Sequence, residues 1–114
     1  MNRGEVWQMS LDSPAADQTA EGASRLVVIL SSDALAVLPL RIVVPLTPWK
    51  EDFSAAPWIL RVPPVLNSGL EQVMAADALQ VRSVSTARLR RKVGDLPQRL
   101  TGEIAEAVAG IIQP

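Results

Sequence analysis

Two polar residues stand at the ends of the most apolar segments of the chain. Arg25 directly precedes residues 26–30 (LVVIL), and Thr47 directly follows residues 41–46 (RIVVPL). If these segments are antiparallel strands, the start of one lies beside the end of the other, so a guanidinium and a hydroxyl meet at one edge of the sheet. A guanidinium offers a fork of donors that matches phosphoryl oxygens, and a hydroxyl adds an uncharged hydrogen bond. The pair therefore suits a phosphate; the alternative is a solvated cation and a residue that ends a strand.

The composition limits the chemistry of such a site. The chain has 114 residues, with 11 Lys plus Arg against 12 Asp plus Glu, and it contains no His and no Cys. Nucleophilic systems built on His or Cys, disulfides and the usual zinc ligand sets are therefore excluded, and we expect neither a metal nor a cofactor. The net charge of -1 excludes a broadly basic nucleic-acid coat, so any nucleic-acid site is local.

No membrane or export segment is expected. The first residues, MNRGEVWQMSLDSP, lack the apolar core of a signal peptide, and no apolar run approaches the roughly 18 residues that span a bilayer. These features predict a soluble, cytoplasmic protein without a membrane partner.

Short strands are expected to position the two polar residues. Residues 26–30 and 41–46 are typical of buried strands, and further strands are expected from about residue 3 and over 58–62 (WILRV). Residues 71–84 fit one long strand, although the stretch MAADAL within them also suits a helix.

The rest of the chain supplies a loop and a helix. Residues 12–24 are expected to form a loop, longer than most connections in small domains. Apolar residues at spacings of three and four predict an amphipathic helix over about 97–112. Together the elements predict one domain over residues 1–114, mainly β, in which an antiparallel barrel or sheet is capped by the C-terminal helix.

Four motifs in a consistent order connect the chain with a known family. They combine turn residues with apolar strand residues, and they are Arg3, Gly4, Glu5, Val6 and Trp7; Gly22, Arg25, Val27, Val28, Ser31, Ser32 and Asp33; Val43, Val44, Pro45, Leu46 and Thr47; and Gly69, Leu70, Gln80, Val81, Arg82, Ser83, Val84, Arg88 and Leu89. The chain thus resembles the MazF/PemK (Kid) toxins of type II toxin-antitoxin systems over nearly its whole length. The resemblance implies a small SH3-like twisted antiparallel β barrel, PemK/CcdB-like, with a C-terminal α-helix, working as a homodimer.

The resemblance also implies an activity. Members of the family are sequence-specific, metal-independent endoribonucleases that cleave single-stranded RNA, often mRNA, and are neutralised by a MazE-like antitoxin. The family's active-site arginine and threonine fall on Arg25 and Thr47. Attack by the 2′-OH of the RNA would leave a 2′,3′-cyclic phosphate and a 5′-OH end. We expect Arg25 to bind the scissile phosphate and Thr47 to hold a nonbridging oxygen.

One departure from the family concerns proton transfer. The family often has an acidic residue directly before the motif glutamine, whereas this chain has Leu79 before Gln80. Asp77 lies two residues before Leu79, a spacing that returns to the same face of a strand, so it is the candidate for proton transfer. The alternative is a solvated carboxylate or one that belongs to a turn.

RNA recognition is expected from a separate set of residues. Unstacked bases are bound through amide and guanidinium groups and through stacking, which favours Gln80, Arg82, Ser31, Trp49 and the loop 12–24. For Trp49, packing is the alternative role. A cationic cluster is also placed to guide the RNA backbone or to meet an acidic antitoxin segment, unless it is only a solvated face; its members are Arg82, Arg88, Arg90, Arg91 and Lys92.

Two other functional classes stay open. The same fold would suit a CcdB-like toxin that inhibits a protein partner and cleaves nothing, and the pair Arg25 and Thr47 favours the enzyme over it. A family member that has lost its activity is the other alternative, for which Leu79 is the one hint.

Overall fold

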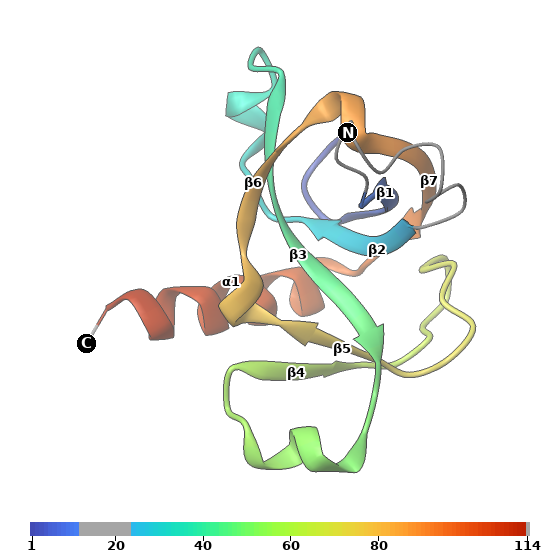
Figure 1. Ribbon diagram of the computed structural model, residues 1–114, viewed down its shortest axis with the longest axis vertical. Helices are drawn as coiled ribbons and strands as arrows, with labels where there is room; N and C mark the ends of the chain where they lie inside the picture. Colours follow the sequence, from blue (N-terminus) through green and yellow to red (C-terminus); the bar gives the residue numbers. More distant parts are fainter. Residues whose placement is uncertain (12–23, 114) are drawn as a thin grey trace.

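A strongly twisted antiparallel sheet of seven strands forms the body of the protein (Figure 1). The computed structural model describes residues 1–11 and 24–113, so most of the expected loop 12–24 lies outside the described residues. The strands are β1 (Glu5–Ser10), β2 (Ser24–Ile29), β3 (Leu40–Pro48), β4 (Ile59–Val62), β5 (Met74–Asp77), β6 (Arg82–Ser85) and β7 (Leu89–Asp95). Across the sheet they run in the order β4, β5, β3, β2, β1, β7, with β6 also paired to β3. The predicted mainly β fold is confirmed.

The single α-helix among the described residues is α1 (Gln98–Ile112), close to the predicted range 97–112. It covers one face of the sheet (Figure 1) and buries Leu100 and Ile104 in a core cluster with Val28, Val44 and Leu46. Full burial of one such side chain contributes about 1.5–3 kcal/mol, which offsets the glycines within the helix. In the part of the chain that the structure describes, no helix has the length and apolar character needed to cross a membrane.

A second core cluster occupies the opposite face of β2 and β3. Side chains alternate along a strand, so Val27, Ile29 and Val43 face away from α1 and pack with Met9. The sheet therefore has one face that α1 covers and an opposite face with its own apolar cluster. This second cluster includes Val27, near the start of β2.

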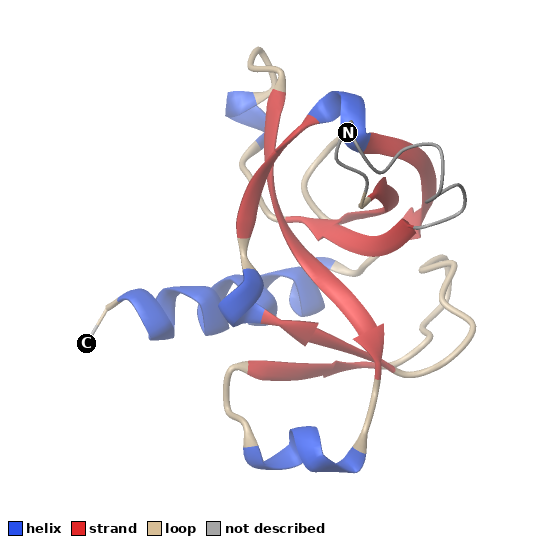
Figure 2. Cartoon of the chain, viewed as in Figure 1, coloured by secondary structure: helices blue, strands red, loops and turns tan. Residues whose placement is uncertain are grey.

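The connections between strands include four short 3₁₀ turns, which Figure 2 shows as blue segments between the red strands. They are η1 (Asp33–Leu35), η2 (Glu51–Ala55), η3 (Ala78–Gln80) and η4 (Thr86–Arg88). The turn η3 divides the segment 71–84 into β5 and β6, so the prediction of one long strand there is wrong, as is a helix over MAADAL. One physical reason is local: the Asp77 carboxylate accepts a hydrogen bond from the backbone N–H of Leu79, a side-chain cap that replaces the strand ladder.

The neighbouring strand β3 leaves room for this turn. On one edge β3 pairs first with β6, ending at Val43 opposite Arg82, and then with β5, starting at Leu46 opposite Ala76. Between the two ladders lies Pro45, which has no backbone N–H to donate. The gap in the pairing is filled by η3, and the candidate site forms beside it.

Candidate active site

Arg25 and Thr47 occupy neighbouring register positions at one end of the ladder between β2 and β3. These strands pair antiparallel, with Val27 opposite Pro45 and Leu26 opposite Leu46, which meets the condition set in the sequence analysis. The next position outward holds Arg25 on β2 and Thr47 on β3, and strand alternation places both on the face of Val27 and Pro45. Both residues are half-buried, so part of each side chain packs in the protein and part is accessible to a ligand.

A pocket of about 230 Å³ opens on this face. Its polar lining residues are Arg25, Gln80 and Arg82, which come from β2, η3 and β6 and were all expected at the site. Its apolar lining residues are Met9, Leu11, Val27, Val43 and Pro45. Apolar walls with a few convergent donors are typical of a binding pocket for a partly polar ligand.

Hydrogen bonds join Arg25 to a carboxylate through an amide. The Nη1 group of Arg25 donates to Oε1 of Gln80 at 3.4 Å, and Nε2 of Gln80 donates to Oδ2 of Asp77 at 3.0 Å. Oδ1 of Asp77 accepts from the backbone N–H of Leu79 at 3.1 Å. Asp77 thus reaches the site by capping η3 and not through the strand alternation that the sequence suggested. Asp77 is not a lining residue of the pocket, and its contact with a lining residue is the hydrogen bond from Gln80.

The pocket is locally cationic although the chain as a whole is slightly acidic. Among the residues that the structure describes, two guanidinium groups, those of Arg25 and Arg82, line it, and no carboxylate does. Within residues 1–11 and 24–113, neither arginine has an ion-pair partner. A guanidinium carries five N–H donors, so one bond to Gln80 leaves Arg25 most of its donors for an anionic ligand.

Trp49 and Ser31 have different surroundings from these residues. Trp49 lies two positions after Thr47, and its ring meets that of Phe53 edge to face, with centroids 5.7 Å apart. Ser31 lies beyond the far end of β2, is buried, and its Oγ accepts the backbone N–H of Ile42 at 3.1 Å. The structure therefore does not bring Ser31 to the pocket and gives its hydroxyl a structural role.

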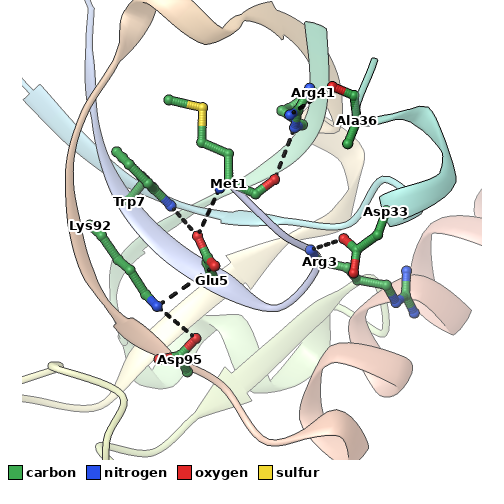
Figure 3. A network of polar contacts seen from close by, with 9 residues as sticks. All are labelled: Met1, Arg3, Glu5, Trp7, Asp33, Ala36, Arg41, Lys92 and Asp95. Carbon is green, nitrogen blue, oxygen red and sulfur yellow. Dashed lines mark hydrogen bonds and ion pairs between the residues drawn. The ribbon is translucent and has the colours of Figure 1, made fainter. Parts of the chain in front are cut away.

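The cationic cluster of the sequence divides into separate roles. Arg88 donates from both Nε and Nη2 to the carbonyl oxygen of Ser10, and Lys92 pairs with Glu5 and Asp95 (Figure 3). The hydrogen bond to Asp95 is the largest influence that raises the pKa of Lys92. Arg82 lines the pocket from another strand, β6, so Arg82, Arg88 and Lys92 have different surroundings.

The apolar walls of the pocket carry no signal in the sequence. Met9, Val43 and Pro45 are buried strand residues, and nothing in their pattern separates them from ordinary core. Leu11 is the exception because it is 45% exposed. These residues are identified as pocket-lining residues only when the pairing of distant strands is known.

The fold and this site define a class of protein, and comparison with known families agrees. The family model described as PemK-like, MazF-like toxin of type II toxin-antitoxin system matches residues 2–112. The chain belongs to this family.

Individual relatives are similar over nearly their whole length. Endoribonuclease MazF9 of Mycobacterium tuberculosis (strain ATCC 25618 / H37Rv) is 29% identical over 111 residues, which cover 95% of this chain and 92% of that protein. Two solved structures share the fold. An endoribonuclease in complex with its cognate antitoxin from Mycobacterial species has a TM-score of 0.74 at 17% identity, covering 100% of this chain and 97% of that one. Mycobacterium tuberculosis toxin MazF-mt6 has a TM-score of 0.72 at 21% identity, with 95% of each chain covered.

Proposed function

We propose that this chain is the toxin of a toxin-antitoxin pair and acts as a sequence-specific, metal-independent endoribonuclease on single-stranded RNA, including mRNA, in the cytoplasm. The observation that carries the proposal is the Arg25 guanidinium, which lines a cationic pocket without a carboxylate partner in the described part of the chain. Thr47 is not a lining residue, but it lies at the neighbouring register position on β3. Support also comes from the family of the chain and from a relative that is named an endoribonuclease.

The reaction needs no nucleophile from the protein. The 2′-oxygen of the RNA forms a bond to phosphorus, the bond from phosphorus to the 5′-oxygen breaks, and the proton lost by the 2′-OH is balanced by one gained at the 5′-oxygen. Arg25 binds the phosphate and stabilises the negative charge that grows on it, and the Thr47 hydroxyl donates to a nonbridging oxygen. The products carry a 2′,3′-cyclic phosphate and a 5′-OH.

The same face supplies contacts for RNA bases. Gln80 and Arg82 offer amide and guanidinium groups to an unstacked base, and the apolar walls of the pocket pack against its ring. Trp49, which directly follows β3 and lies two residues after Thr47, is proposed to stack on a neighbouring base. We further propose a homodimer, with a MazE-like antitoxin as the inhibiting partner; a solved relative was obtained in complex with its cognate antitoxin.

Cleavage of a long single-stranded RNA in the presence of EDTA tests the proposal. The wild type is expected to cut at discrete sites and to leave 5′-OH ends. Arg25→Ala and Thr47→Ala are each expected to cut about 10²- to 10³-fold more slowly, the usual cost of one donor that stabilises a transition state. Arg99→Ala is the matched control because it removes the same charge from an exposed position on α1.

Two results would contradict the proposal. Intact RNA after incubation with folded wild-type protein, free of antitoxin, would exclude the proposed ribonuclease activity. It would favour a CcdB-like toxin that inhibits a protein partner. Full activity of Arg25→Ala would keep a nuclease but move its site away from this pocket.

A further inference from the structure

The hydrogen-bond chain from Asp77 through Gln80 to Arg25 has a fixed direction. A carboxylate only accepts hydrogen bonds, so Asp77 selects the NH₂ side of the Gln80 amide. The carbonyl side of the same amide then faces the Arg25 guanidinium, which only donates. A reversed amide would oppose two acceptors at one end and two donors at the other. The carboxylate therefore determines which group Gln80 presents to Arg25.

The amide between the two charges also preserves the charge of Arg25 for a ligand. A carboxylate in direct contact with the guanidinium would form a bidentate pair and compete with phosphate for the same donors. Here the carboxylate bonds to Gln80 and to the backbone N–H of Leu79 instead. Arg25 receives a neutral acceptor that orients it at one nitrogen, Nη1, and within residues 1–11 and 24–113 its remaining donors have no other partner.

Local structure fixes Asp77, the first residue in this series of hydrogen bonds. Asp77 ends β5 and caps η3, so its carboxylate position is set by the backbone of the turn. The turn η3 also fills the gap in strand pairing beside Pro45. Gln80 is the last residue of η3 and itself is exposed, so without Asp77 its amide would rotate freely in water.

We propose that Asp77 and Gln80 are positioning residues that orient Arg25 toward the scissile phosphate, with Asp77 acting through the Gln80 amide and not at the reacting atoms. The inference rests on the proposed function of Arg25. It assigns this chain a route by which a carboxylate supports the reaction although Leu79 occupies the position where the family often has an acid.

Two substitutions of Asp77 separate positioning from capping. In Asp77→Asn, Oδ1 still caps η3 while the NH₂ group faces Gln80 and favours the reversed amide. In Asp77→Ser, the hydroxyl still caps the turn but is too short to hold Gln80. Each is expected to lower the single-turnover cleavage rate about 10-fold, which corresponds to one hydrogen bond to a charged group. The affinity for a long RNA is expected to change much less, because other phosphate contacts dominate it.

A double variant tests the route through Gln80. Gln80→Leu removes the amide, so adding Asp77→Asn to it is expected to cause no further loss of rate. Ser85→Ala is the matched control: Ser85 caps η4 in the same way, by accepting from the backbone N–H of Ala87, and lies outside the pocket lining. It is expected to affect thermal unfolding without affecting the rate per folded molecule.

The outcomes distinguish this inference from the proposed function. Wild-type rates for both Asp77 variants, beside an inactive Arg25→Ala, would overturn the positioning role and leave the proposed function intact. A loss from Asp77→Asn that persists in the Gln80→Leu background would overturn the route through Gln80 and place Asp77 at the chemistry. A loss that follows the folded fraction, as in Ser85→Ala, would reduce Asp77 to a structural cap. RNA left intact by the wild type would overturn both proposals.

Discussion

The two ends of the ladder between β2 and β3 use their arginines in opposite ways. At one end Arg25 makes a single hydrogen bond to the described part of the chain, to Gln80 at 3.4 Å, and lines an open pocket. Near the other end Arg41 donates at 2.8–3.0 Å to three backbone carbonyl oxygens, those of Met1, Leu38 and Leu40. The same side chain type therefore holds backbone segments together in one region and keeps its donors available in the other.

The end around Arg41 is a dense polar network (Figure 3). The backbone N–H of Arg3 donates to Asp33, and Glu5 accepts from Nε1 of Trp7 and pairs with Lys92. Because these groups already have partners inside the fold, their loss is expected to change stability. Because Arg25 has so few partners, its loss is expected to change activity. The partners of an arginine, more than its presence in the sequence, thus indicate whether it serves stability or activity.

The largest expected effect comes from Arg25→Lys. Lysine keeps the positive charge but loses the planar fork that binds phosphate and meets Gln80, so cleavage is expected to fall about 100-fold. The free energy of unfolding is expected to stay within about 0.5 kcal/mol of wild type, because the side chain makes one long hydrogen bond. Cleavage kinetics and urea unfolding of the same preparation measure both quantities. A loss of stability as large as the one expected for Arg41→Lys would contradict the difference in role between the two arginines.

The same substitution at Arg41 is expected to do the reverse. A single ammonium group cannot reach the carbonyl oxygens of both Met1 and Leu38, so Arg41→Lys is expected to lower the free energy of unfolding by about 1–2 kcal/mol. The cleavage rate per folded molecule is expected to be unchanged. Thermal unfolding, with activity normalised to folded protein, checks the prediction. A variant that is fully stable but slow on RNA would show that this network also serves the reaction.

A third prediction concerns the pH dependence of the network. Burial of Glu5 raises the pKa of its carboxyl, but the Trp7 hydrogen bond, the Asn2 backbone, the Met1 amino group and Lys92 outweigh burial and lower the pKa below its ordinary 4.5. A carboxyl with a lowered folded pKa stabilises the fold above its unfolded pKa, and this contribution is lost as pH falls through the folded value. Glu5→Gln is thus expected to be less stable than wild type near pH 7, by about 1–2 kcal/mol. The difference should shrink below pH 4.5 in urea unfolding series; a constant difference would contradict it.

The sequence predicts the main strands and the central pair of the site because both depend on local pattern. The runs 26–30 and 41–46 are rich in β-branched and apolar residues, which identifies them as buried strands, and the structure pairs them antiparallel. That pairing is enough to bring Arg25 and Thr47 to neighbouring positions. A position at the end of an apolar strand is thus visible without a structure.

The rest of the site depends on contacts between distant segments. The turn η3 forms because Asp77 caps it and because Pro45, on another strand, leaves a ladder position empty. Likewise, Arg88 belongs to a basic run in the sequence, but its partner is the carbonyl oxygen of Ser10. No local pattern distinguishes an arginine with such a partner from one that faces a ligand.

The smallest expected effect tests the boundary between the two regions. The Ser31 hydroxyl accepts the backbone N–H of Ile42, which Ser31→Ala would leave without that partner, so a loss of about 1 kcal/mol in the free energy of unfolding is expected. Cleavage and RNA affinity are expected to match wild type, because Ser31 is buried and does not line the pocket. A fluorescence-based RNA binding assay beside urea unfolding measures both. Weaker RNA binding at unchanged stability would extend the RNA surface along the whole of β2, and the division between a structural end and a functional end would fail there.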